Sequence, residues 1–202
     1  TIDGTRIPVT SSRNLEELPL DRVDVMIDCT GAFKTEAKLA PYFEAGVKKV
    51  VVSAPVKDGN AANIVYGVNH DIYDPAAHRI VTAASCTTNC LAPIAKVLHE
   101  AFGIREGVIN TVHAYTNDQS LADVPHSDWR RSRAAAENII PTSTGAAKAV
   151  GEVLPQLKGR LDGIASRVPV PDGSVVELFA ELEKEVTAAD INSAMQSAAA
   201  TK

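Results

Sequence analysis

Several features that define common protein classes are missing from this sequence of 202 residues. It has no run of about 18 apolar residues, so we expect no membrane-spanning helix. Lys and Arg number 20 against 25 Asp and Glu, and their scatter argues against a face that binds nucleic acid. The three cysteines form no CxxC pair, and their low, odd number favours the cytoplasm over a secreted, disulfide-bonded protein.

Two kinds of binding motif are missing as well. The twelve glycines include no GxG, the minimal sign of a dinucleotide-binding turn. None of the five histidines forms a spaced ligand set with Cys, Asp or Glu, so we predict no metal site. What remains is an ordinary globular composition, 45% hydrophobic and 22% charged, in a chain long enough to bury a core.

Strand-like and helix-like segments alternate in the first part of the chain. The candidate strands are residues 23–29, 47–53, 63–68 and 79–83. Residues 34–45 have helical propensity, although Pro41 interrupts them. This order predicts crossover units and a parallel sheet, and the apolar middle strands are typical of strands covered on both faces.

The pattern changes after Cys86. Residues 89–102 predict a helix that places Pro93 in its first turn and ends at Gly103. Residues 116–138 are polar and lack a sustained period, so we predict a long functional loop there. The further candidate strands are 107–115, 164–168 and 174–183, and the further candidate helices are 146–154 and 187–200, the last with Thr187 as its N-cap and Asp190 in a capping box.

The clearest candidate for chemistry is the stretch ASCTTNC at residues 84–90, where a β-rich run passes into a helix. Cys86 would face backbone N–H groups and the positive end of the helix dipole, which favour a thiolate. The hydroxyls of Ser85 and Thr87 could bind an oxyanion there. In the alternative interpretation, the hydroxyls only cap a helix and Cys86 is a small buried core residue. We interpret Cys90 as a packing residue and Cys29 as inert.

His113 closes the apolar run 108–112. A lone histidine at such a place is often a satisfied core residue. Its functional interpretation depends on Cys86, because a thiolate nucleophile needs a nearby base and open α/β folds place active residues at strand ends.

Three clusters suggest that anions bind. The run TSTG at 142–145 precedes a predicted helix, so its hydroxyls and N–H groups could hold a phosphate. Arg167 closes a predicted strand, and Arg130, Arg131 and Arg133 lie in the long loop. Helix capping and solvated arginines are the alternative interpretations, but several such clusters in one short chain favour a phosphorylated substrate.

The motifs SCTTNC at 85–90 and TVHAYTNDQ at 111–119 resemble those of phosphorylating glyceraldehyde-3-phosphate dehydrogenase. Two further segments also resemble this family: NIIPTSTGAAKAV at 138–150 and RVPVP at 167–171. Order and spacing agree over essentially the whole chain. The resemblance implies an α/β fold, with a partial Rossmann-like parallel sheet in residues 1–85 followed by an α+β catalytic domain in residues 86–202.

The resemblance also implies a reaction. Glyceraldehyde 3-phosphate would be oxidised by NAD, with NADP not distinguished, and phosphorylated to 1,3-bisphosphoglycerate. Cys86 would form a thiohemiacetal and then a thioester, His113 would act as its base, and inorganic phosphate would cleave the thioester.

Further roles come from the resemblance alone. The implied ligands of the substrate phosphate are Thr116, Arg131 and Arg167. The implied ligands of the attacking phosphate are Ser85, Thr87, Thr144 and Gly145. The implied cofactor contacts are Arg13, Thr30, Gly31, Ser53 and Asn117. The loop 116–138 resembles a loop that packs across a subunit interface, which implies a homotetramer.

The missing Gly-rich turn is a departure from the family. We therefore expect Thr1 to lie inside the cofactor domain and Lys202 inside the catalytic domain, and we expect these 202 residues alone to be weakly active or inactive as a dehydrogenase. Two alternatives stay open: a thiol-dependent acyl-transfer or hydrolytic enzyme that uses only Cys86 and His113, and an inactive remnant that joins oligomers of a full-length protein.

Overall fold

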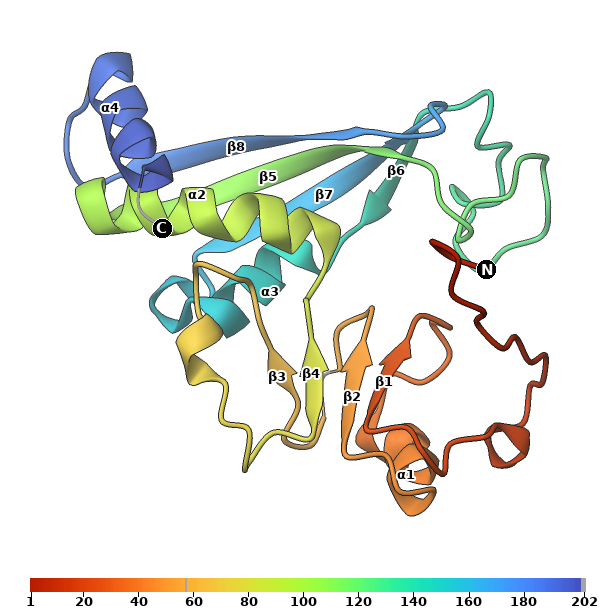
Figure 1. Cartoon of the computed structure of the whole chain (residues 1–202). Helices are drawn as coiled ribbons and strands as arrows, with labels where there is room; N and C mark the ends of the chain where they lie inside the picture. The colour runs from red at the N-terminus through yellow and green to blue at the C-terminus, as the bar shows by residue number, and fades with distance from the viewer. Residues whose placement is uncertain (57, 201–202) are drawn as a thin grey trace. The chain divides into compact units, whose positions relative to one another are not determined.

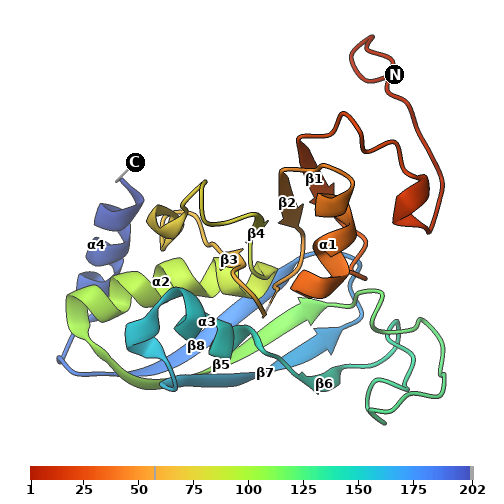
Figure 2. The same cartoon turned by 90° about the horizontal axis from the view of Figure 1, so that it is seen from below.

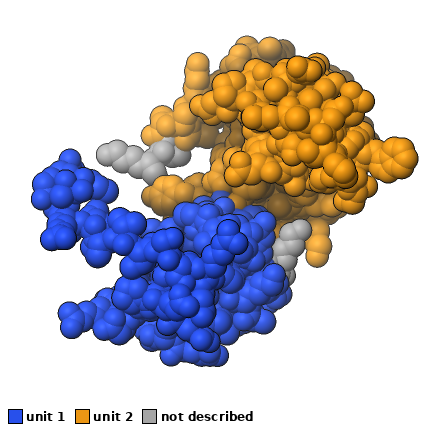
Figure 3. Space-filling view, turned by 90° about the vertical axis from the view of Figure 1, so that its right-hand side faces the viewer, with its two compact units in different colours: residues 1–64, 72–83 blue, residues 65–71, 84–202 orange. Residues whose placement is uncertain are grey.

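The computed structural model of the chain describes residues 1–56 and 58–200. The chain divides into two compact units, which Figure 3 colours separately: residues 1–64 with 72–83, and residues 65–71 with 84–202. Each unit has its own four-stranded sheet and hydrophobic core. The domain boundary expected between residues 85 and 86 stays a prediction.

The first unit is built on a parallel sheet with the strand order β1-β2-β4-β3 (Figure 1). Its elements are η1 (Leu15–Glu17), β1 (Val25–Asp28), α1 (Glu36–Glu44), β2 (Lys49–Val52), β3 (Ala62–Asn63) and β4 (Ile80–Thr82). The parallel order confirms the fold class. Asp28 pairs with Val52, so β1 and β2 end at the same level and their carboxyl ends form one edge.

Helix α1 forms despite its proline. The hydroxyl of Thr35 caps it by accepting the N–H of Lys38 at 3.3 Å, and the helix continues through Pro41. Leu39 and Tyr42 are buried in the core of this unit. Strand β1 lies at the sheet edge with exposed Val25 and Ile27, whereas the inner strands β2 and β4 place Val50, Val52 and Ile80 in the core.

The second unit is built on a mixed sheet with the order β6-β7-β5-β8. Strands β5 and β7 are parallel, whereas β6 and β8 run antiparallel to their neighbours. Its elements are α2 (Cys86–Phe102), β5 (Ile104–Ala114), β6 (Ile140–Ser143), α3 (Ala146–Val153), η3 (Pro155–Leu157), β7 (Leu161–Val168), β8 (Ser174–Leu182) and α4 (Ala188–Ala199); η2 (His70–Ile72) precedes β4 in the chain. Helices α2 and α3 cover one face of the sheet, and α4 packs beside α2, an α+β arrangement (Figure 2).

Local signals explain the helix ends in this unit. Ser85 caps α2 by accepting the N–H of Thr88 at 3.1 Å, and Gly103 ends it with a φ of 74°. The predicted start at residue 89 is therefore wrong: the helix begins at Cys86, and Pro93 lies in its interior. The predicted capping box of Thr187 and Asp190 at the start of α4 is confirmed.

Two other predictions need correction. The first part of the TSTG run belongs to strand β6 and only its last part precedes α3, because Thr142 pairs with Ala165 of β7. The expected strand at 63–68 is reduced to β3, Ala62–Asn63. The predicted loop is confirmed, since residues 115–139 contain no helix or strand.

Apolar side chains are exposed on the face of the second sheet that lies opposite the helices. The exposed residues there are Val108, Ile164, Val175 and Phe179. None of the helices in residues 1–56 and 58–200 combines the length and apolarity that crossing a membrane requires.

Candidate active site

Cys86 and His113 come together in the second unit. Cys86 is the first residue of α2, and His113 lies next to the end of β5. The Sγ atom of Cys86 lies 3.4 Å from the Nε2 atom of His113. Cys86 is exposed, so the interpretation of this thiol as a buried core residue is wrong. Both residues line a cavity of about 380 Å³ between α2, β5 and the start of β8.

Arg167 stands behind the histidine. The parallel register of β5 and β7 pairs the two residues, and the Nη1 atom of Arg167 lies 2.8 Å from Nδ1 of His113. The carbonyl oxygen of Ala114 lies 2.6 Å from the same Nδ1 and accepts from Arg167 at 3.0 Å. The Ala114 oxygen can accept from both groups, so Nδ1 donates to Ala114 in one ring tautomer and accepts from Arg167 in the other. With the ring proton on Nδ1, the Nε2 atom that faces Cys86 can accept a proton.

The electrostatics of Arg167 link these groups to the loop. Burial lowers the pKa of its guanidinium, while the charges of Cys86 and Asp118 oppose this shift and that of Arg131 adds to it. Its Nε atom is buried and has no hydrogen-bond partner in the described part of the chain. A half-buried arginine with an unused donor is a ready ligand for an anion.

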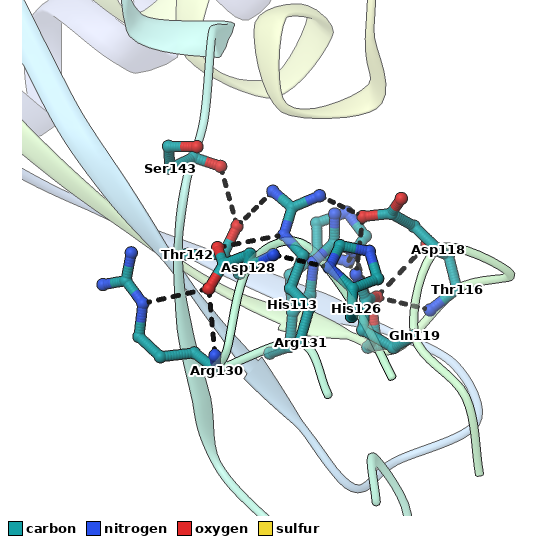
Figure 4. Close-up of polar contacts among 12 residues, drawn as sticks. His113, Thr116, Asp118, Gln119, His126, Asp128, Arg130, Arg131, Thr142 and Ser143 are labelled. Atoms are coloured by element: carbon teal, nitrogen blue, oxygen red, sulfur yellow. Dashed lines mark hydrogen bonds and ion pairs between the residues drawn. The ribbon is translucent and has the colours of Figure 1, made fainter. Parts of the chain in front are cut away.

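The long loop holds Arg131 in place (Figure 4). Its Nη1 atom forms an ion pair with Asp118, and its Nη2 atom donates to the Thr142 hydroxyl at 2.6 Å. Asp128 lies 3.6 Å from its Nε atom. The backbone N–H of Arg130 lowers the pKa of Asp128, so this carboxylate stays charged. Arg131 is thus fixed from three sides, with a side chain that is only 21% exposed.

The other predicted phosphate ligands lie in the same unit. Thr116 is exposed at the start of the loop, and its N–H donates to Gln119 at 3.0 Å. Thr144 and Gly145 stand between β6 and α3, where the Thr144 hydroxyl accepts from Ala146 at 3.2 Å. The Ser85 hydroxyl is engaged in capping α2, and Thr87 is buried in the first turn.

The predicted cofactor residues divide between the units. Thr30, Gly31 and Ser53 lie together in the first unit, at the carboxyl ends of β1 and β2. Arg13 belongs to the N-terminal segment of that unit and is exposed, whereas Asn117 belongs to the loop of the second unit.

Several polar partners have no counterpart in the sequence analysis. They are Asp28, Tyr42, Asp118, Asp128 and Thr142 as a ligand of Arg131. Only Asp118 had a usable signal, since it stands in the TNDQ stretch beside predicted phosphate ligands.

Fold and site together define a class of α/β proteins in which a cysteine at a helix start faces a histidine at a strand end. Sequence comparison narrows that class. The family described as "Glyceraldehyde 3-phosphate dehydrogenase, C-terminal domain" matches residues 85–202. The chain belongs to the glyceraldehyde 3-phosphate dehydrogenase family.

Curated relatives extend the similarity to the first unit. Glyceraldehyde-3-phosphate dehydrogenase of Streptomyces coelicolor is 57% identical over 201 residues, which cover 98% of this chain and 60% of the relative. The enzyme of Geobacillus stearothermophilus is 56% identical over 98% of this chain and 59% of its own length. That of Mycobacterium leprae is 59% identical over 88% of this chain and 52% of its own. The chain thus spans about three fifths of the relatives with the longest matches.

Proposed function

We propose that the chain carries the catalytic groups of an enzyme that oxidises and phosphorylates glyceraldehyde 3-phosphate to 1,3-bisphosphoglycerate. The observation that carries the proposal is the 3.4 Å contact between Cys86 Sγ and His113 Nε2. It places a base beside an exposed nucleophile, which the covalent route requires.

The mechanism follows from these two groups. His113 takes the thiol proton as the Cys86 sulfur attacks the aldehyde carbon, and it returns this proton to the new oxyanion to give a thiohemiacetal hydroxyl. NAD, when bound, supplies the hydride acceptor. His113 takes the hydroxyl proton as the hydride leaves, and the carbonyl re-forms as a thioester. An oxygen of inorganic phosphate then attacks the thioester carbon, and the Cys86 thiolate leaves as the acyl phosphate forms. The N-terminal N–H groups of α2 face the oxyanion in both additions.

Two arginines support a phosphorylated substrate. The charge of Arg131 lowers the pKa of Arg167, and the charge of Cys86 raises it. The three side chains therefore lie close enough to interact electrostatically. With Thr116 they would hold the phosphate of the aldehyde. Ser85, Thr87, Thr144 and Gly145 would hold the attacking phosphate near the starts of α2 and α3, where helix dipoles favour anions.

The chain's own residues also fit a dinucleotide. Gly31 has a φ of 69°, and nothing lies within 4 Å of the place where its Cβ would stand, so a ligand can approach the backbone of this turn. The Thr30–Gly31 turn and Ser53 would contact NAD at the carboxyl edge of a parallel sheet, the usual place for such ligands. Arg13 and Asn117 complete the proposed set.

The reverse of the phosphate step tests the chemistry without cofactor. The chain is incubated with 1,3-bisphosphoglycerate, and peptide mass spectrometry locates the acyl group. Acylation of Cys86 with release of phosphate is expected, and C86S should abolish it while C90S retains it. Acylation elsewhere, or none, would contradict the proposal.

The same experiment separates the proposal from the thiol-hydrolase alternative. A phosphorylating enzyme returns its acyl group faster as inorganic phosphate is added. A hydrolase loses the group to water at a rate that phosphate does not change. An inactive remnant would not be acylated at all. The family match and the two arginines favour the first outcome.

We further propose that the chain forms homo-oligomers. The exposed Val108, Ile164, Val175 and Phe179 share one sheet face, and an apolar patch of this kind is typical of a subunit interface. A second copy of the chain can match it through a two-fold axis. Light scattering should show F179D shifted to smaller species, and an unchanged mass would contradict the interface. The cytoplasmic location stays a prediction, in keeping with three free thiols.

A further inference from the structure

A buried carboxylate organises the sheet edge where the proposed cofactor residues lie. Asp28 ends β1 and is only 2% exposed. Its Oδ1 atom accepts the backbone N–H of Thr30 at 2.9 Å and the Thr30 hydroxyl at 2.8 Å. Its Oδ2 atom accepts the hydroxyl of Tyr42 at 3.0 Å. A buried carboxylate is costly unless its oxygens are hydrogen-bonded, so these contacts are needed to keep Asp28 in place.

The main chain of Asp28 reaches the neighbouring strand end. Its carbonyl oxygen accepts the N–H of Ser53 at 2.9 Å. One residue therefore holds the turn after β1 through its side chain and the residue after β2 through its backbone. These are the two places that supply Thr30, Gly31 and Ser53.

Tyr42 in helix α1 contacts both Asp28 and Phe33. It is 2% exposed, and its ring meets Phe33 edge-on with the ring centroids 6.1 Å apart. Burial and the Asp28 carboxylate raise the pKa of Tyr42 to about 12, so its hydroxyl remains a donor throughout the neutral range. The turn is thus fixed at Asp28 and again at Phe33.

This network changes the role of Thr30. Both of its polar hydrogens are donated to Asp28, and its hydroxyl oxygen accepts from Ala32 at 3.2 Å. In contrast, no partner accepts the N–H of Gly31 anywhere in residues 1–56 and 58–200. The exposed Gly31 and Ser53 are the groups left to face a ligand.

We propose that Asp28 is a positioning residue for the dinucleotide: it fixes the Thr30–Gly31 turn so that Gly31 and Ser53, and not the polar groups of Thr30, contact the cofactor. This inference rests on the proposed function. It predicts that D28N weakens NAD binding although Asp28 itself touches no cofactor, because an amide has one acceptor oxygen where the carboxylate has two, so it cannot accept from both Thr30 and Tyr42, and it lacks the charge that strengthens these bonds.

The test measures the dissociation constant of NAD for the full chain by calorimetry. D28N should raise it roughly tenfold, the effect of losing a hydrogen bond to a charged group. The control D21N changes an exposed aspartate of the same unit and should bind NAD as the unmodified chain does. Acylation of Cys86 by 1,3-bisphosphoglycerate takes place in the other unit. Its rate should therefore be equal in the unmodified chain, D28N and D21N.

A second pair of variants covers the case in which D28N does not fold. T30V removes one donor to Asp28 at an exposed position, whereas T30S keeps both donors. T30V should bind NAD several-fold more weakly, and T30S should bind normally. Equal binding by T30V and T30S, or a folded D28N with unchanged affinity, would overturn the positioning role.

The phenol of Tyr42 gives a readout that does not depend on NAD. Ultraviolet titration should show its pKa falling below about 12 in D28N, because the carboxylate contribution is lost while the larger contribution of burial stays. A titration that does not move would mean that Asp28 does not hold Tyr42 and would overturn the network. If the unmodified chain itself binds no NAD, the cofactor part of the proposed function fails, an outcome distinct from normal binding that D28N leaves intact.

Discussion

The Nε2 atom of His113 lies 3.4 Å from the Sγ atom of Cys86, although the two residues are 27 positions apart in the chain. Cys86 begins α2, and His113 reaches it from β5, against which α2 packs in the core of the unit. Arg167 contacts the other side of the imidazole ring from the next strand. The nucleophile, its base and an anion ligand therefore come from three different elements.

This contact predicts the reactivity of the Cys86 thiol. H113N should slow alkylation of Cys86 by iodoacetamide at neutral pH by roughly tenfold, because the sulfur loses the ring nitrogen 3.4 Å away that can take its proton. Peptide mapping of the alkylated chain measures the rate at each cysteine. Cys29 and Cys90 are also exposed and serve as internal controls, with rates that should not change. Equal slowing at all three cysteines would point to unfolding rather than to the contact.

The two-sided binding of the Arg131 guanidinium predicts that lysine, which keeps the positive charge, cannot replace it without loss of activity. Separate nitrogens of this guanidinium meet Asp118 and Thr142, a geometry that lysine cannot reproduce. R131K should lower kcat/KM for acylation by 1,3-bisphosphoglycerate by roughly 10- to 100-fold, the effect of one or two charge-assisted hydrogen bonds. Alkylation by iodoacetamide, which carries no phosphate, should be unaffected. A parallel loss with both reagents would show that R131K distorts Cys86 instead.

Local signals allowed much of the fold to be predicted from the sequence. The stop at Gly103 and the capping box at Thr187 depend on neighbouring residues, and both were predicted. Strand β6 was missed because its residues IPTS contain a proline and two hydroxyls, which are typical of caps, while its pairing with β7 is a contact between distant segments. The start of α2 was placed too late because Pro93 was assigned to the first turn.

The same difference between local signals and contacts of distant segments applies to the site. Cys86 and His113 are recognisable from the elements they terminate, but their contact depends on how α2 packs on β5. Two partners that fix the site, Asp28 for the Thr30 turn and Asp128 for Arg131, carry no local pattern that sets them apart from surface carboxylates. Their roles follow only from tertiary structure.

The raised pKa of Tyr42 predicts how stability falls in alkali. The folded pKa is about 12 and the usual value is 10.0, so the folded state keeps its proton at pH values where the unfolded state loses it. The contribution of the Tyr42–Asp28 contact is therefore complete below about pH 10 and is lost as the pH rises to 12. Urea unfolding at several pH values should show Y42F less sensitive to pH in this window. The exposed Tyr66 provides the control Y66F, which should keep the full pH dependence.

The close approach of two strands predicts the effect of a single methyl group. A Cβ at Gly163 would stand 2.4 Å from the backbone oxygen of Ile109, its partner in the β5–β7 ladder. Since a backbone atom cannot move aside cheaply, G163A should destabilise the chain by roughly 1–3 kcal/mol. G145A makes the same chemical change where nothing lies within 4 Å, and it should cost clearly less. Equal losses in urea unfolding would show that the β5–β7 spacing adapts freely.

The capping box of α4 predicts a contribution to stability that disappears in acid. Hydrogen bonds from the Thr187 hydroxyl and backbone N–H lower the pKa of Asp190 below its usual value of 3.8. Its contribution is therefore present above the unfolded pKa and is lost as the pH falls through the lower, folded value. D190A should reduce the helix content and the Tm at neutral pH, and the difference from the unmodified chain should shrink as the pH drops below about 4. Q196A alters an exposed residue of the same helix without a titrating group, so its effect should not vary with pH. A D190A difference that stays constant down to the lowest pH would mean that helix propensity, and not the ionised cap, accounts for the role of Asp190.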